Sequence, residues 1–151
     1  MNIIIIGATS GIGKALYENY VTKDNIVAIV GRRTKLLEQL QKEHPSNTII
    51  SKADVTNQQE IGQTIESLLH KLGHIDMAIV CSGVGEINPL LDYTVEKPTI
   101  ETNVMGWTFV IDMSITFLNI KSKGISLPSH QLEDYGENPC HLHIVHLRPT
   151  R

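Results

Sequence analysis

The chain has 151 residues, of which 41% are hydrophobic and 19% are charged, as expected for one globular domain with a buried core. Its formal net charge of -3 gives no electrostatic reason to expect nucleic acid or an acidic membrane surface as a partner. Two cysteines, Cys81 and Cys140, are too few for a disulfide framework and are typical of proteins in the reducing cytoplasm.

The apolar stretches predict neither a signal peptide nor a membrane span. The opening "MNIIII" lacks a basic region, and its apolar run ends at Gly7. The longest apolar stretch, residues 104–118, contains Asp112 and falls short of the ~20 residues that a spanning helix needs. We therefore expect a soluble, cytoplasmic protein.

Strand and helix patterns alternate from the first residues to about residue 123. The strands are short, mostly apolar and rich in β-branched residues, as in a parallel sheet that is buried on both faces. The order predicts a doubly wound, Rossmann-like α/β fold with strand order 3-2-1-4. The predicted strands are Asn2–Ile6, 26–30, 48–51 and Met77–Val80, and the predicted helices are 14–21, Thr34–Glu43, Gln58–Leu72 and 100–118.

The alternation stops after about residue 123. Residues 124–151 contain Pro128, Pro139 and Pro149 and lack a helical period. We therefore expect an incomplete α/β domain over residues 1–123 and an irregular tail over residues 124–151. The fourth strand should then form an exposed sheet edge, and the helix 100–118 should lose packing surface. This predicts marginal stability and self-association through that helix.

A glycine-rich turn follows the first strand. In "GATSGIG", Gly7 permits the tight turn, Gly11 lets the backbone approach a pyrophosphate, and Gly13 allows helix and strand to pack closely. The following helix offers free N–H groups and the positive end of its dipole to phosphates. This context favours a dinucleotide site over a merely structural turn. The residues of the turn expected at the cofactor are Gly7, Thr9, Ser10, Gly11, Ile12 and Gly13.

The residues after the second strand indicate which dinucleotide binds. An NAD site carries Asp or Glu here for the ribose 2′-hydroxyl, whereas this chain carries Arg32 and Arg33. Guanidinium groups suit a 2′-phosphate because they form bidentate, charge-assisted hydrogen bonds. We therefore predict NADP in preference to NAD. The alternative is that both arginines are solvated on a loop.

These motifs, together with "ADVT" at residues 53–56 and "TNVMG" at residues 102–106, resemble the short-chain dehydrogenase/reductase family over residues 1 to about 123. The resemblance implies an oxidoreductase that transfers hydride between NADP(H) and a small carbonyl or alcohol substrate. It also implies that Asp54 and Val55 contact the adenine. The alternative for Asp54 is a helix cap.

The family's "NNAG" after the fourth strand is replaced here by Val80-Cys81-Ser82-Gly83. The resemblance implies that the backbone of Ser82 and Gly83 lines the nicotinamide ribose, and we expect Cys81 to be a small buried apolar residue. Asn103 matches the family's asparagine, which holds a water of the proton relay. Its alternative role is packing within the helix.

The family's catalytic groups have no match at the expected place. The family uses a tyrosine as acid, with its pKa lowered by a lysine four residues on, and a serine that holds the substrate oxygen. The one Y-x-x-x-K of this chain, Tyr93 to Lys97, precedes Asn103 instead of following it, and Tyr135 is followed four residues later by Pro139. We expect Tyr93 and Lys97 on a surface loop or helix start, and we predict that this chain is inactive alone.

A shift of reading frame accounts for the tail. Residues 127–151, back-translated and read one base earlier with free choice among synonymous codons, permit the text "FAITSIGRLRGKPLPSAYSASKAYQ". It contains the family's Y-x-x-x-K, with a serine thirteen residues before the tyrosine. The hypothesis is a frameshift near residues 123–125.

Two other functions stay open from the residues alone. Cys140, His141, His143 and His146 are candidate zinc ligands, but no second pair stands at ligand spacing, and we assign no metal. The chain is otherwise a non-enzymatic fragment that binds NADP or a protein partner.

Overall fold

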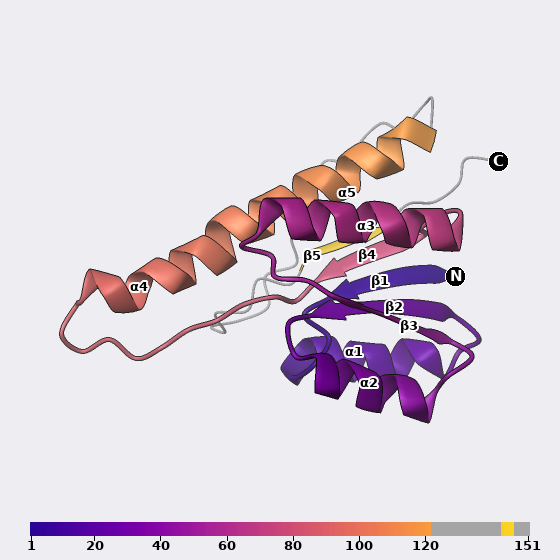
Figure 1. Ribbon diagram of the computed structural model, residues 1–151, viewed down its shortest axis with the longest axis horizontal. Helices are drawn as coiled ribbons and strands as arrows, with labels where there is room; N and C mark the ends of the chain where they lie inside the picture. Colours follow the sequence, from indigo (N-terminus) through magenta and orange to yellow (C-terminus); the bar gives the residue numbers. More distant parts are fainter. Residues whose placement is uncertain (122–142, 147–151) are drawn as a thin grey trace.

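A computed structural model of the chain describes residues 1–121 and 143–146. Strands and helices alternate along the chain as predicted (Figure 1). In chain order the elements are β1 (Asn2–Ile6), α1 (Gly11–Val21), β2 (Ile26–Gly31), α2 (Thr34–Glu43), β3 (Thr48–Lys52), α3 (Gln58–Leu72), β4 (Met77–Val80), α4 (Tyr93–Ile100), a π-helical segment (Glu101–Gly106), α5 (Trp107–Lys121) and β5 (His143–His146).

The sheet has the order β3-β2-β1-β4-β5, so the predicted order 3-2-1-4 is confirmed. The first four strands are parallel, and β5 pairs antiparallel with β4, with Ala78 opposite Val145 and Ile79 opposite Ile144. The expectation of an exposed edge at β4 is therefore wrong, and residues 143–146 of the tail are not irregular. The physical reason is that an edge strand has unpaired backbone N–H and C=O groups, which form hydrogen bonds with any extended segment that lies beside them. The rest of the predicted tail lies outside the described residues.

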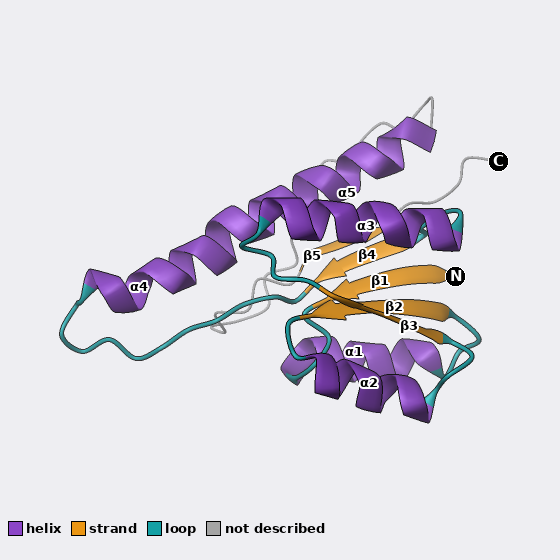
Figure 2. Ribbon diagram, viewed as in Figure 1, coloured by secondary structure: helices purple, strands orange, loops and turns teal. Residues whose placement is uncertain are grey.

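The sheet is covered on both faces. Figure 2 shows α1 and α2 on one face and α3 and α5 on the other. Side chains alternate along β1, so Ile3 and Ile5 join the cluster under α1 and α2, whereas Ile4 and Ile6 join the cluster under α3 and α5. All four are at most 2% exposed. This double burial is why the strand is a continuous apolar run.

The helix predicted for residues 100–118 begins earlier than expected. α4 starts at Tyr93, where the Asp92 carboxylate accepts a hydrogen bond of 2.8 Å from the backbone N–H of Thr94. Pro98 lies inside α4, although proline lacks a backbone donor and ordinarily ends or kinks a helix. The chain nevertheless continues through the π-helical segment into α5. The predicted start was wrong because the cap at Asp92 stabilises a first turn that the apolar pattern does not mark.

The outer side of this helical run carries apolar side chains. Ile100, Val104 and Met105 are 45%, 56% and 58% exposed, while Val110 of α5 is fully buried in the cluster beneath α3. Self-association through these side chains stays a prediction. None of the helices in residues 1–121 is long and apolar enough to cross a bilayer.

Candidate cofactor site

A cavity of about 370 Å³ lies at the carboxyl ends of the parallel strands, where the loops after β1, β2, β3 and β4 meet. This is the point where the strand order reverses, with β1 flanked by β2 and β4, and ligands of doubly wound sheets bind at such a point. The predicted cofactor residues that line it are Gly7, Thr9, Ser10, Gly11, Ile12, Arg32, Arg33, Asp54, Val55, Ser82 and Gly83.

Gly13 and Asn103 are the two predicted site residues that do not line this cavity. Six further residues line it without having been predicted as site residues: Ile6, Gly31, Ala53, Cys81, Val84 and Thr102. Each of these six is next to a predicted site residue in the sequence, so the motifs contained the signal but not the direction of each side chain. That the residues of the cavity bind a cofactor stays a prediction.

Each of the three glycines of the turn is explained by a different feature of its surroundings. Gly7 has φ of 90°, and a Cβ there would lie 2.6 Å from the carbonyl carbon of Cys81 and the nitrogen of Ser82, so the turn rests directly on the end of β4. A Cβ at Gly13 would collide with the carbonyl group of Gly7, which explains the close contact of α1 with β1. Gly11 has φ of 55° and open space beside it, so its backbone is accessible from the cavity.

Gly13→Ala is expected to lower the free energy of unfolding by about 1–3 kcal/mol, the usual cost of overpacking. The added methyl group would have to displace the backbone of the turn, because it would overlap the Gly7 carbonyl group. Urea unfolding of the variant and the parent chain measures the difference.

The control is Gly62→Ala, which also adds a methyl group inside a helix. There the methyl carbon would meet only the ends of the Met113 and Phe109 side chains, at 3.6 and 4.0 Å. In a helix interior alanine is more favourable than glycine by about 1 kcal/mol of helix stability, so this variant should be as stable as the parent or more stable. Equal unfolding midpoints for the two variants would contradict the argument.

The start of α1 combines free N–H groups with an unusual cap residue. Ser10 occupies the N-cap position, but its side chain does not cap the helix. Instead, Ser10 Oγ accepts a hydrogen bond of 2.6 Å from Nη2 of Arg33. The first N–H groups of α1 therefore lack a side-chain acceptor from Ser10, and they lie beside a cavity where an anion can take that place.

Arg33 connects the end of β2 to the glycine-rich turn. Its Nε and Nη2 donate hydrogen bonds of 3.0 and 2.6 Å to Oγ1 of Thr9, in addition to the bond to Ser10. These contacts hold the guanidinium group at the rim of the cavity before any ligand arrives. Arg33 and these three hydrogen bonds are nevertheless exposed, so the alternative of solvated arginines on a loop stays open.

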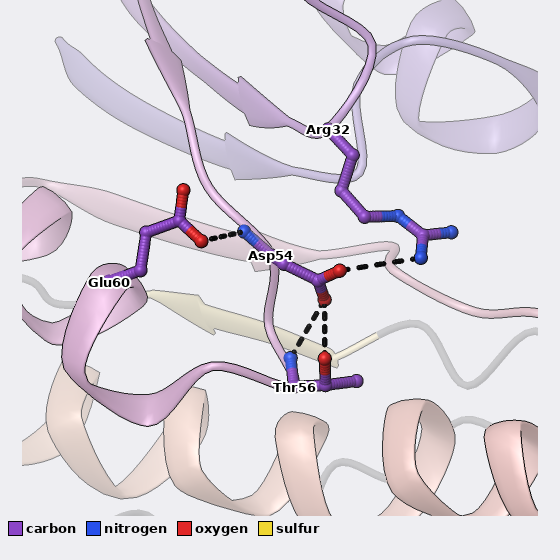
Figure 3. A network of polar contacts seen from close by, with 4 residues as sticks. All are labelled: Arg32, Asp54, Thr56 and Glu60. Atoms are coloured by element: carbon purple, nitrogen blue, oxygen red, sulfur yellow. Dashed lines mark hydrogen bonds and ion pairs between the residues drawn. The ribbon is translucent and has the colours of Figure 1, made fainter.

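Arg32 points to the opposite side, towards the end of β3 (Figure 3). Its Nη1 lies 3.4 Å from Oδ2 of Asp54, and its side chain is 58% exposed. Oδ1 of Asp54 accepts hydrogen bonds of 3.0 and 2.8 Å from the backbone N–H and the hydroxyl group of Thr56. Oε2 of Glu60 accepts a bond of 3.3 Å from the backbone N–H of Asp54.

These contacts keep Asp54 ionised. Partial burial opposes the charged form, but the hydrogen bonds from Thr56 and the charge of Arg32 outweigh it, so the pKa of Asp54 lies below its ordinary value. The helix-cap alternative for Asp54 is wrong, because the N-cap of α3 is Asn57, whose side chain accepts from the backbone N–H of Glu60 at 3.1 Å. Asp54 therefore places a negative charge at the edge of the cavity that it lines.

Asn103 lies in the π-helical segment and holds the loop after β4. Its Oδ1 accepts from the backbone N–H of Val84 at 2.9 Å, and its Nδ2 donates to the carbonyl oxygen of Val84 at 2.8 Å. Both polar atoms of the Asn103 amide are thus hydrogen-bonded to the backbone of Val84, which supports a structural role for Asn103. A role in a proton relay stays a prediction.

Tyr93 and Lys97 lie away from the cavity, at a helix start as predicted. Tyr93 is 67% exposed, and Lys97 forms an i,i+4 ion pair of 3.6 Å with Glu101. Of the candidate zinc ligands, Cys140 and His141 lie outside the described residues. Within the described ranges there is no group of three side chains that could hold a metal ion.

Curated proteins similar to this chain are oxidoreductases. An uncharacterized oxidoreductase of Staphylococcus haemolyticus is 30% identical over 124 residues, which cover 80% of this chain and 54% of that protein. The NADP-dependent 3-hydroxy acid dehydrogenase YdfG of Escherichia coli is 26% identical over 150 residues, which cover 99% of this chain and 54% of that protein. The chain therefore spans about half the length of the curated relatives that it matches.

Solved structures and the family profile agree with this similarity. A short chain dehydrogenase of Bacillus anthracis is 26% identical with a TM-score of 0.74, over 80% of this chain and 50% of that one. The closed form of serine dehydrogenase complexed with NADP+ is 25% identical with a TM-score of 0.69, over 77% of this chain and 48% of that one. The profile of the short chain dehydrogenases matches residues 1–125. This chain belongs to the short chain dehydrogenase family of oxidoreductases.

Proposed function

We propose that the chain binds NADP(H) in the cavity at the carboxyl ends of β1 to β4. By membership of its family it is the cofactor-binding part of an oxidoreductase that reduces a carbonyl or oxidises an alcohol. The single observation that carries the cofactor choice is the pair Arg32 and Arg33 at the end of β2, where an NAD site would have a carboxylate. A 2′-phosphate would meet two guanidinium groups there.

The residues present fit each part of such a cofactor. The free N–H groups at the start of α1, with the open side of Gly11, suit the pyrophosphate. Arg33 suits the 2′-phosphate, and Asp54 and Val55 suit the adenine. On the β4 side the hydroxyl group of Ser82 is buried and has no hydrogen-bond partner among the described residues, so a polar group of a ligand would satisfy it. When bound, the nicotinamide ring would give or take the hydride.

The relatives support the same choice. YdfG is NADP-dependent by name, and serine dehydrogenase was solved with NADP+. These are properties of those proteins, and they favour the phosphorylated cofactor here because this chain carries the two arginines. The cytoplasmic location expected from the cysteines remains part of this proposal.

The polypeptide of residues 1–151 is proposed to bind NADP(H) without turning over a substrate. Neither the serine nor the tyrosine–lysine pair of the family stands at the matching place in its sequence, and Tyr93 and Lys97 do not line the cavity. The frameshift hypothesis explains this lack, and sequencing the codons around residues 120–151 decides it.

The test of the cofactor proposal is a titration of this polypeptide with NADPH and with NADH, followed by calorimetry. NADPH is expected to bind at least about tenfold more tightly, since one hydrogen bond to a charged group contributes about 1.5–3 kcal/mol. Competition with adenosine 2′,5′-bisphosphate and with adenosine 5′-monophosphate locates the preference at the 2′-phosphate. Equal affinities for NADPH and NADH would contradict the proposal.

A further inference from the structure

Ser82 stands out among the residues of the cavity because its hydroxyl group is buried and unsatisfied. Oγ of Ser82 has no hydrogen-bond partner among the described residues, although Ser82 lines the cavity. A buried hydroxyl group without a partner costs free energy, so native proteins rarely keep one unless it has another use. Within residues 1–121 and 143–146 this hydroxyl group therefore contributes no hydrogen bond to the cofactor-free fold.

The neighbouring polar groups are already engaged. The amide of Asn103, which lies 3.6 Å from where a Cβ of Gly83 would be, gives its oxygen and its nitrogen to the backbone of Val84. Below Ser82, the glycine-rich turn packs so closely that a Cβ at Gly7 would lie 2.6 Å from the backbone nitrogen of Ser82. The described neighbours of Ser82 are therefore closely packed or already hydrogen-bonded, and a ligand in the cavity that Ser82 lines can supply the missing partner.

The topology indicates which part of a dinucleotide reaches Ser82. Arg32, Arg33 and Asp54 follow β2 and β3, on one side of β1, whereas Ser82 follows β4 on the other side. In doubly wound sheets the dinucleotide crosses the ends of the strands at this switch point, with one half on each side. If the arginines hold the 2′-phosphate of the adenosine half, the nicotinamide half lies on the side of Ser82.

We propose that the Ser82 hydroxyl group is a positioning group for the nicotinamide half of the cofactor, to whose ribose hydroxyl groups it hydrogen-bonds. This inference rests on the proposed binding of NADP(H) and adds a contact made by the side chain, which the resemblance to the family did not imply. The hydroxyl group is then unsatisfied in the free protein and satisfied in the complex.

The experiment is Ser82→Ala, measured by thermal melting of the cofactor-free protein and by calorimetric titration. Two effects of opposite sign are expected. The cofactor-free variant should melt at the same temperature or a few degrees higher, because an unsatisfied hydroxyl group is removed. The Kd for NADPH and the Kd for NADH should both rise about fivefold, the value of one neutral hydrogen bond. The Kd for adenosine 2′,5′-bisphosphate, which has no nicotinamide half, should not change.

The matched control is Ser114→Ala. Ser114 is also buried, but its Oγ donates to the carbonyl oxygen of Val110 at 2.7 Å, away from the cavity, so no affinity should change. Wild-type affinity of Ser82→Ala for NADPH would overturn the inference, and so would an equal loss for the bisphosphate. A marked fall in the melting temperature would also overturn it, because the hydroxyl group would then have a partner in the free protein. Absence of NADPH binding by the parent chain itself, with or without bisphosphate binding, would instead refute the proposed function and with it this contact.

Discussion

We expect the 151-residue polypeptide to be inactive. With any carbonyl substrate it should oxidise NADPH no faster than a protein-free control, and with any alcohol it should reduce NADP no faster than that control. A positioned general acid contributes about 10²–10⁴-fold to such a reaction, and the orientation of the substrate can contribute more. Neither is supplied by the cavity that the structure describes. The loss should therefore be complete within the sensitivity of an absorbance assay.

The ionisable groups of the cavity explain this expectation. Asp54 has a pKa below its ordinary value and so has no proton to give at neutral pH. Cys81 lines the cavity and is partly buried against the apolar cluster beneath α1, so it is not the fully buried residue that the sequence predicted. Tyr93 is exposed and does not line the cavity.

The measurement compares this polypeptide with a repaired one. In the repaired chain the residues from 127 onward read "FAITSIGRLRGKPLPSAYSASKAYQ" and continue into a complete domain of the family. Activity in the repaired chain alone would support both the missing acid and the frameshift. Comparable NADPH oxidation by both chains, abolished in the present one by Tyr93→Phe, would show that the site and the tail had been misinterpreted.

Arg33→Ala is expected to weaken NADPH binding by about 10- to 100-fold and NADH binding by less than about twofold. Each hydrogen bond to a charged group contributes about 1.5–3 kcal/mol. The contacts of Arg33 with Thr9 and Ser10 hold its guanidinium group in place in the free protein, so little side-chain entropy is lost when a phosphate binds. Selectivity for the 2′-phosphate should therefore depend mainly on this residue.

Arg32→Ala should have a smaller effect, because Arg32 has to leave its ion pair with Asp54 before it can reach a phosphate. Lys42→Ala is the control for overall charge, since Lys42 lies in the last turn of α2, at the far end from Arg33. Calorimetric titration with both cofactors measures all three variants. A preference for NADPH that survives Arg33→Ala unchanged, or that Lys42→Ala removes equally, would contradict the assignment.

The parts of the fold that could be predicted are those where local patterns carry the information. A strand that is buried on both faces of a parallel sheet is a continuous apolar run. The runs "IIII" in β1 and "MAIV" in β4 therefore predict such strands directly. The leucine and isoleucine stripe of α3 faces the sheet as its period requires. The start of α4 was missed because its signal is one capping carboxylate, Asp92, before a helix that is mostly exposed.

The site was predictable to the level of its loops. Glycines, arginines and the Asp54–Val55 pair come at the ends of predicted strands, and parallel strands bring these ends to one edge of the sheet. The contacts between the loops were not predictable. The helix cap stayed an alternative for Asp54 because residues 54–60 contain three residues that can cap, Asp54, Thr56 and Asn57. Only the structure shows that Asn57 caps α3 and that Asp54 faces Arg32.

By itself, the sequence determined the strands, most of the helices, the order 3-2-1-4 and most of the residues that line the cavity, because each depends on a local period or on the handedness of a crossover. Only the tertiary structure decided that β5 covers the edge of β4, that Asn103 holds Val84 and that the hydroxyl group of Ser82 has no partner in the described residues. These features depend on how closely segments far apart in the chain approach one another. Pairing with an open strand edge and the partner of a buried polar atom are set by the space between segments, and no local pattern encodes that space.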